Sequence, residues 1–166
     1  MIRNLWSPWR MKYLMETPPE GCIFCAYATG GEDVKNLVLL RGRHHYIILN
    51  LYPYATAHLM LVSNRHVPTL SQLQSEEMAE AVEMLVKIER AVQAVYRPDG
   101  ANWGVNLGRC AGAGVEGHVH LHYVPRRLRD TEQPSAADSA DLPEPLATTF
   151  QRLRSALAAE GAKGRK

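Results

Sequence analysis

Three histidines near residue 120 alternate with apolar residues, in the segment Gly117-His118-Val119-His120-Leu121-His122-Tyr123. Successive side chains of a β-strand point to opposite faces of the sheet, so the three imidazoles are expected to line one face. The apolar residues between them would pack on the other face. Two kinds of chemistry fit this pattern. One is a three-histidine metal site that leaves a position for water, and the other is attack by a neutral imidazole on a phosphate group.

A glycine-rich segment leads directly into this strand and favours the phosphate chemistry. It runs Asn106-Leu107-Gly108-Arg109-Cys110-Ala111-Gly112-Ala113-Gly114. Glycines let backbone amides approach an anion closely. Protonated imidazoles beside such a loop would stabilise negative charge on the phosphate and on the leaving group.

Strand-like runs and two helical patterns surround these residues. Strands are predicted over Leu37–Leu40, Tyr46–Asn50, His58–Val62, Asn102–Leu107 and His118–Val124. Helices are predicted over Ser75–Arg97, with Ser75 as the capping residue, and over Leu146–Ala159. Short connections between neighbouring strands favour antiparallel pairing. The sequence therefore predicts an α+β fold, an antiparallel sheet with helices on one face.

The histidine strand resembles that of the histidine-triad nucleotide hydrolases and transferases, and the resemblance covers roughly residues 22–127. It includes the segment Ala57-His58-Leu59-Met60-Leu61-Val62 and Asn50, which ends the strand before it. The resemblance implies a five-stranded antiparallel sheet with two helices, an enzyme that forms a nucleotidyl-histidine intermediate, and a homodimer. An adenine nucleotide or a dinucleoside polyphosphate would be the small-molecule partner, and the nucleophile would need no catalytic metal.

By the same resemblance, the site residues fall into two groups. The catalytic group would be His120 as the nucleophile, His122 at the phosphate and His58 supporting from the neighbouring strand. The nucleotide-binding group would be Asn50 at the ribose, and Asn106, Gly112, Gly114 and His122 at the phosphates.

The branch of the family is indicated by Trp6-Ser7-Pro8-Trp9-Arg10-Met11-Lys12-Tyr13-Leu14, Asn50-Leu51-Tyr52-Pro53-Tyr54 and Asn106-Leu107-Gly108. These segments look like the bacterial diadenosine tetraphosphate phosphorylases. Ala113-Gly114 stands where many hydrolase and phosphoramidase members have Gly-Gln, so phosphate would be held by other groups, with Arg109, Arg126 and Arg127 as candidates. A diadenosine polyphosphate hydrolase, a nucleoside phosphoramidase and a non-catalytic nucleotide-binding adaptor remain alternatives.

A second site is indicated by Cys22 and Cys25, whose spacing allows two thiolates to share one tetrahedral zinc ion. The pair alone supplies two ligands, and a reduced, buried cysteine pair is the alternative. Histidine-triad relatives complete such a site at the positions of His66 and His118, with His44 or His45 as substitutes for His66. Four protein ligands would make this zinc structural.

Composition bounds the remaining possibilities. A net charge of +2 and the lack of a long basic stripe do not indicate a nucleic-acid-binding protein. The sequence contains no run of about 18 apolar residues, so no membrane span is predicted. Three cysteines are an odd number, which fits a reducing, cytoplasmic setting. The expected organisation is an N-terminal arm over residues 1–21, a histidine-triad domain over 22–128, and a C-terminal loop, helix and basic tail over 129–166.

Overall fold

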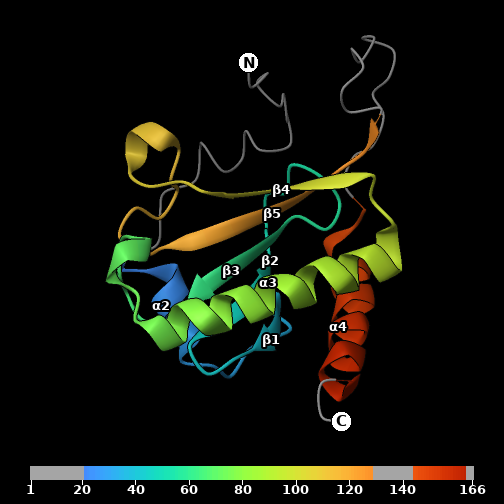
Figure 1. The fold of residues 1–166 in the computed structure, drawn as a ribbon, viewed down its shortest axis with the longest axis horizontal. Helices are drawn as coiled ribbons and strands as arrows, with labels where there is room; N and C mark the ends of the chain where they lie inside the picture. The colour runs from blue at the N-terminus through green and yellow to red at the C-terminus, as the bar shows by residue number, and fades with distance from the viewer. Residues whose placement is uncertain (1–20, 129–143, 164–166) are drawn as a thin grey trace.

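The computed structural model describes residues 21–128 and 144–163. Its centre is a five-stranded antiparallel sheet in the order β1-β2-β3-β5-β4 (Figure 1). The strands are β1 Val38–Arg41, β2 His45–Leu49, β3 Leu59–Ser63, β4 Gly100–Val105 and β5 His120–Arg126. The predicted sheet is confirmed. The arm predicted over residues 1–21 and the loop after residue 128 lie almost wholly outside the described residues.

Two long helices cover one face of this sheet, as the sequence predicts. They are α3 Ser75–Tyr96 and α4 Leu146–Lys163, and they pack against each other and on the sheet (Figure 1). The apolar side chains of β2 and β3 at odd positions, with Tyr123 of β5, face these helices in a core of buried residues. The helix side of the sheet therefore carries the main hydrophobic core.

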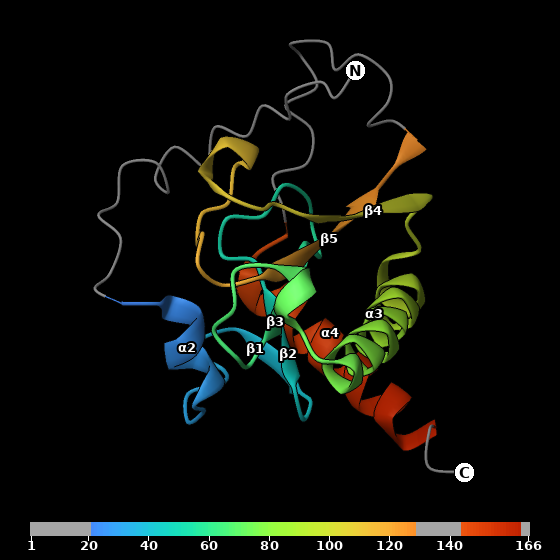
Figure 2. The same ribbon diagram turned by 60° about the vertical axis from the view of Figure 1, so that its left-hand side comes forward.

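The first helix, α2 Ile23–Ala28, was not predicted and lies on the opposite side of the sheet (Figure 2). It follows Cys22 and packs Phe24 into a second apolar cluster with Val38, Tyr46, Ile48, Met60 and Val62. Two short 3₁₀ turns, Leu70–Gln72 and Arg109–Ala111, complete the described elements.

The start of α3 corrects a prediction. Gln74, and not Ser75, is the capping residue, and its backbone N–H donates to the Glu77 carboxylate across 2.7 Å. This bond satisfies a backbone group at the helix start, as a reciprocal cap does. The helix ends at Tyr96, and the capping residue Arg97 adopts a left-handed conformation at φ 45° just before Pro98.

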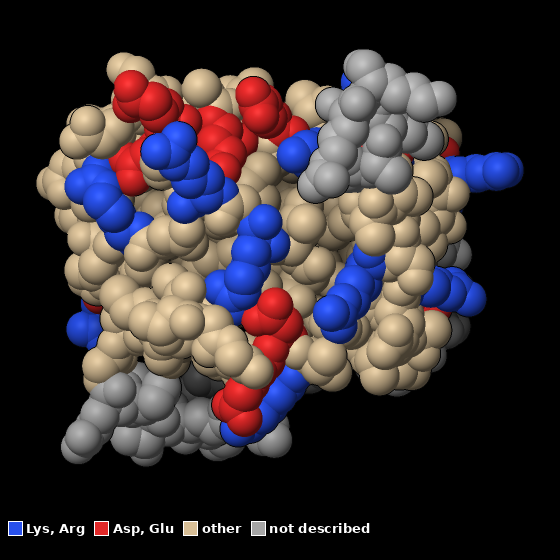
Figure 3. Space-filling model, turned by 90° about the horizontal axis from the view of Figure 1, so that it is seen from below, with Lys and Arg blue, Asp and Glu red and all other residues tan. Residues whose placement is uncertain are grey.

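Pairing within the sheet puts β5 at the centre of the site. His120 lies opposite Val62 of β3, and His122 lies between Met60 of β3 and Gly104 of β4. Among the described residues, no helix is both long enough and apolar enough to cross a membrane. On the face shown in Figure 3, basic and acidic side chains are interspersed rather than separated by sign.

Candidate active site and metal centre

His120 begins strand β5 and its ring is fixed by a backbone group. Nδ1 lies 2.8 Å from the carbonyl oxygen of His118. A carbonyl oxygen only accepts, so Nδ1 carries the proton and donates it, and Nε2 of the neutral ring keeps its lone pair. The side chain is 4% exposed. His120 is thereby prepared to act as a nucleophile through Nε2.

The protonation state of His120 follows from its surroundings. Burial lowers the pKa of His120 and outweighs the hydrogen bond to the His118 carbonyl, which acts in the opposite direction. The ring is therefore neutral near pH 7, the state in which an imidazole can attack.

His58 and His122 form a hydrogen-bonded pair next to His120. The backbone N–H of Tyr54 donates to Nδ1 of His58 across 3.1 Å, so Nε2 of His58 carries the proton. That Nε2 lies 3.0 Å from Nδ1 of His122, and His58 therefore donates to His122. The rings of His120 and His122 meet edge to face, with their centroids 5.0 Å apart. The predicted catalytic histidines thus lie together on one side of the sheet.

Asn50 lies beside the pair of His58 and His122. Its Oδ1 accepts the Tyr52 N–H across 2.9 Å, and its backbone N–H donates to the His58 carbonyl across 2.9 Å. Its Nδ2 lies 3.3 Å from Nε2 of His58, but both nitrogens carry hydrogen in this protonation state, so this contact is not a hydrogen bond. The residue is 8% exposed. Asn50 therefore joins the loop after β2 to His58 through the backbone, and its contact with a ribose stays a prediction.

The glycine-rich loop follows β4 and reaches the start of β5. Val105, the last paired residue of β4, lies opposite Leu121, so Asn106 emerges beside the His120 end of the strand. Gly108 and Gly112 have φ values of 77° and 86°, which a glycine adopts without strain. The amide of Gly112 donates to the Arg109 carbonyl at 2.9 Å, inside the loop. A phosphate contact by that amide would require this bond to open.

A second group of side chains gathers beside His120. The ligand atoms of Cys22, Cys25, His66 and His118 all lie within 4.8 Å of one another. Nδ1 of His118 is 3.3 Å from the Cys22 sulfur and 3.5 Å from the Cys25 sulfur, and Nδ1 of His66 is 3.2 Å from the Cys25 sulfur. Nε2 of His118 lies 2.7 Å from the Ser63 carbonyl oxygen and donates to it.

These distances fit a tetrahedral metal ion. Zinc bonds of about 2.3 Å to sulfur and about 2.0–2.1 Å to nitrogen give a sulfur–nitrogen edge of about 3.6 Å in a tetrahedron. The hydrogen bond to Ser63 leaves the lone pair of His118 on Nδ1, the nitrogen that faces both thiols, and it orients the ring as carbonyl partners of metal-ligating histidines do. Two thiols and two imidazoles are the donor set of a structural zinc site.

The same geometry separates the alternatives that the sequence left open. His118 faces the thiols, His120 donates to a carbonyl and His122 is bonded to His58, so the three rings do not converge on one point. Among the described residues, the cysteine–histidine cluster is the group that could hold a metal ion. This arrangement argues against a three-histidine metal site.

Two of the alternative residues named above, His45 and Arg127, are engaged elsewhere. His45, the alternative to His66, lies 3.2 Å from Glu80, on the helix side of the sheet. Arg127 donates to the carbonyls of Tyr96 and Arg97 at the end of α3, where it caps that helix. Arg109 remains at the loop, paired with Glu116 at 3.8 Å.

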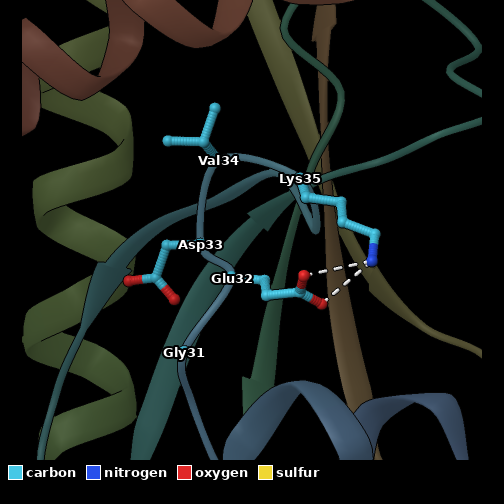
Figure 4. Close-up of a pocket in the computed structure, with 5 residues that line it drawn as sticks. All are labelled: Gly31, Glu32, Asp33, Val34 and Lys35. Atoms are coloured by element: carbon cyan, nitrogen blue, oxygen red, sulfur yellow. Dashed lines mark hydrogen bonds and ion pairs between the residues drawn. The ribbon is translucent and has the colours of Figure 1, made fainter.

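A surface hollow in the connection between α2 and β1 carries no such chemistry. Figure 4 shows its lining residues, Gly31, Glu32, Asp33, Val34 and Lys35. Lys35 forms an ion pair with Glu32 at 3.0 Å, and none of the five residues belongs to the histidine or cysteine groups.

Two residues at the site went unrecognised in the sequence. Tyr54 stacks its ring on His58 at 5.2 Å and supplies the N–H that sets the protonation of that histidine. Phe24 contacts the rings of both His118 and His120. Both residues lie inside segments that the sequence analysis considers. Their roles depend on a backbone N–H and on a ring contact across the fold, and the spacing of residue types in the sequence shows neither.

Known proteins are similar to this chain in sequence. Residues 32–129 match the model of the HIT domain family. The chain is 40% identical over 133 residues to the AP-4-A phosphorylase of Mycobacterium tuberculosis, across 75% of this chain and 68% of that protein. It is 27% identical over 112 residues to the bis(5'-nucleosyl)-tetraphosphatase (asymmetrical) of Schizosaccharomyces pombe, across 68% of this chain and 58% of that protein.

A solved structure agrees with these sequence comparisons. A zinc-bound histidine triad family protein from Mycobacterium smegmatis superposes with a TM-score of 0.69 at 27% identity, over 86% of this chain and 97% of that one. Together with the histidine strand and the five-stranded sheet, these matches establish that the chain belongs to the HIT domain family.

Proposed function

We propose that this chain cleaves dinucleoside polyphosphates through a nucleotidyl-histidine intermediate on His120, as a diadenosine tetraphosphate phosphorylase. The observation that supports the proposal most directly is the bond from Nδ1 of His120 to the His118 carbonyl, which leaves the lone pair on Nε2. The similarity to the AP-4-A phosphorylase of M. tuberculosis supports the choice of substrate.

In the first step, the Nε2 lone pair of His120 attacks the α-phosphorus in line. A nitrogen–phosphorus bond forms, and the bond from that phosphorus to the bridging oxygen breaks, so ATP leaves with the bonding electrons. The ring now carries a positive charge, which the Nδ1–H shares with the His118 carbonyl. His122, held by His58, would bind a phosphate oxygen as charge develops.

In the second step, an oxygen of inorganic phosphate attacks the same phosphorus from the opposite side. The nitrogen–phosphorus bond breaks, its electrons return to Nε2, and ADP is released. Water in the same position would release AMP instead, which is the hydrolase alternative. Arg109, exposed at the loop, is the cation nearest in sequence to the phosphate-binding glycines and would attract the acceptor.

Product analysis tests this proposal. The protein is incubated with diadenosine tetraphosphate, with and without inorganic phosphate, beside the variants His120→Gly and His44→Gly. ATP and ADP formed only with phosphate support phosphorolysis, and ATP and AMP formed without phosphate support hydrolysis. His120→Gly should be inactive and His44→Gly active. Binding of AMP with no cleavage of any adenylated substrate, phosphoramidates included, would contradict the proposal and indicate an adaptor.

We further propose that Cys22, Cys25, His66 and His118 bind zinc. Zinc would act as a structural cross-link between α2 and the sheet, because four protein ligands leave no position for water. Metal analysis of the purified chain should give one zinc per chain, lost in Cys25→Ser and retained in Cys110→Ser, where the exposed thiol lies outside the cluster. Equal zinc contents in the two variants would contradict this assignment. We also propose a reducing, cytoplasmic setting, because an odd number of cysteines with no disulfide among the described residues suits such a compartment.

A homodimer is the assembly that the surface supports. Among the described strands β4 lies at the edge of the sheet, and an edge presents unpaired backbone groups to another strand. The neighbouring helix α3 exposes Met78, Val82 and Val86, spaced four residues apart along one face. Sedimentation should report a dimer for the wild type and for Val34→Glu, and a monomer for Val82→Glu. A monomeric wild type would contradict the assembly.

A further inference from the structure

Phe24 occupies a position between the two groups of site residues. In sequence it stands between Cys22 and Cys25, and its side chain is only 3% exposed. Its ring centroid lies 5.5 Å from that of His118, edge to face, and 4.8 Å from that of His120. One apolar side chain thus contacts a ligand of the candidate metal centre and the proposed nucleophile.

The backbone around Phe24 is fixed from the side of the sheet. The hydroxyl of Tyr46 in β2 donates to the Phe24 carbonyl across 2.9 Å. The guanidinium of Arg41 in β1 donates to the carbonyls of Tyr27 and Ala28 at the end of α2, at 2.8 and 3.2 Å. These bonds hold one side of α2, and the thiols of Cys22 and Cys25 hold its other side against His66 and His118.

We propose that Phe24 is a positioning residue for His120, and that metal bound by the cysteine–histidine cluster acts on the reaction by holding Phe24 in place. This inference rests on the proposed function. The ring of His120 is held by the Nδ1 hydrogen bond, by the contact with Phe24 and by the edge-to-face contact with His122. Removing the Phe24 ring takes away one of these contacts and lets the imidazole tilt about the Nδ1 hydrogen bond.

The effect should appear in turnover more than in substrate affinity. Phe24 contacts the nucleophile, and misplacing a reacting group by about 1 Å can cost about 100-fold in rate. Losing an interaction that stabilises only the transition state lowers kcat and kcat/KM together and leaves KM nearly unchanged.

Steady-state kinetics with diadenosine tetraphosphate test the positioning role. Phe24→Leu should lower kcat by about tenfold or more with KM unchanged to within about twofold. Phe24→Tyr, which keeps the ring, should restore most of kcat. Val38→Ala removes a buried residue of the same apolar cluster and should lower thermal stability while leaving kcat unchanged. Unchanged kcat in Phe24→Leu, or an equal loss in Val38→Ala, would overturn the positioning role.

Nuclear magnetic resonance of histidine rings tests the link to the metal without any turnover. The carbon-bound ring protons of His120 sense the ring current of Phe24. Their resonances in Phe24→Leu should therefore differ from those of the wild type. Removing the metal from the wild type should also shift them. In Phe24→Leu, removing the metal should change the chemical shifts of these His120 protons much less than it does in the wild type. Identical metal-induced shifts in the two proteins would overturn the coupling.

Failure of this inference can be told from failure of the proposed function. If wild type cleaves diadenosine tetraphosphate and His120→Gly does not, the proposed function stands whatever Phe24→Leu does. If wild type does not cleave it, the proposed function fails, while the resonance experiment still reports whether metal and Phe24 share one effect on the His120 ring.

Discussion

The carbonyl oxygen of His118 accepts the Nδ1–H of His120 across 2.8 Å, while the ring of His118 faces the thiols of Cys22 and Cys25. One residue thereby serves two purposes with different atoms. Its backbone sets the protonation of the proposed nucleophile, and its side chain contributes to the candidate metal centre.

This division predicts unequal effects for two alanine substitutions. His118→Ala removes one proposed zinc ligand and should lower zinc affinity by at least about tenfold. It should retain measurable turnover, because the backbone carbonyl that accepts the His120 Nδ1–H remains. His120→Ala should retain zinc and lose turnover. Zinc content and initial rates, measured on the same samples, check both expectations. Complete inactivity of His118→Ala with its zinc retained would contradict the separation of roles.

Gly117 should be required for the metal centre. A Cβ atom at this position would lie 3.1 Å from Nε2 and 3.4 Å from Cε1 of His66, closer than most side-chain contacts allow. Gly117→Ala is therefore expected to displace the His66 ring and weaken zinc binding. Competition with a chromophoric chelator measures the change. Gly100→Ala, where a Cβ meets nothing within 4 Å, is the control, and equal affinities for the two variants would argue against the role of His66.

Gly42 should matter for stability rather than for chemistry. An added Cβ would approach Oε1 of Glu80 and Sδ of Met84 to 2.8 Å each. The Glu80 carboxylate has little room to move, because it accepts the backbone N–H groups of Arg43 and His44 at 2.6 and 2.7 Å. Gly42→Ala should lower the free energy of unfolding by about 1–3 kcal/mol, the usual cost of overpacking. Urea unfolding beside Gly100→Ala measures the difference, and identical midpoints would contradict the expectation.

The pair of Glu77 and Arg65 predicts a loss of stability in acid. Two hydrogen bonds of 2.8 and 2.7 Å from the Arg65 guanidinium lower the pKa of Glu77 from 4.5 to about 2. A carboxyl with a lowered pKa in the folded state stabilises that state above its unfolded pKa, and the stabilisation disappears as pH falls from about 4.5 to about 2. Since Arg65 is half exposed, the contribution is on the order of 1 kcal/mol after solvent screening.

The comparison variant for this pair is Glu77→Gln, which should be less stable than wild type at pH 7 and should lose less stability below pH 4.5. Glu76→Gln, an exposed neighbour in the same helical turn, should follow the wild-type curve. Thermal unfolding across this pH range measures the curves. Parallel curves for wild type and Glu77→Gln would remove Glu77 from the acid response.

The sequence predicts strand β5 well because its two faces carry different kinds of residue. Alternation of apolar and polar residues defines β5 and places His120 and His122 on the face away from the main core, while Leu121 and Tyr123 pack toward it. The strand begins at His120, however, and His118 lies before it. The contact of Phe24 with both rings shows that His118 nevertheless lies on the same side of the sheet as His120.

Other features leave no periodic pattern to detect. Helix α2 has six residues, too few for an apolar repeat, and no helix is predicted there from the sequence. The acceptor for His118 is the carbonyl of Ser63, and the donor to His58 is the N–H of Tyr54. Every residue except proline has both groups, so their participation depends on the fold and not on residue type.

The most direct test of the mechanism is detection of the covalent intermediate. The protein is mixed with diadenosine tetraphosphate in the absence of phosphate, quenched within one turnover under alkaline conditions that preserve phosphoramidates, and digested for peptide mass spectrometry. We expect an adenylyl group on His120, which is lost on a chase with inorganic phosphate. An adduct on another residue, or rapid cleavage with no adduct at any time, would contradict it.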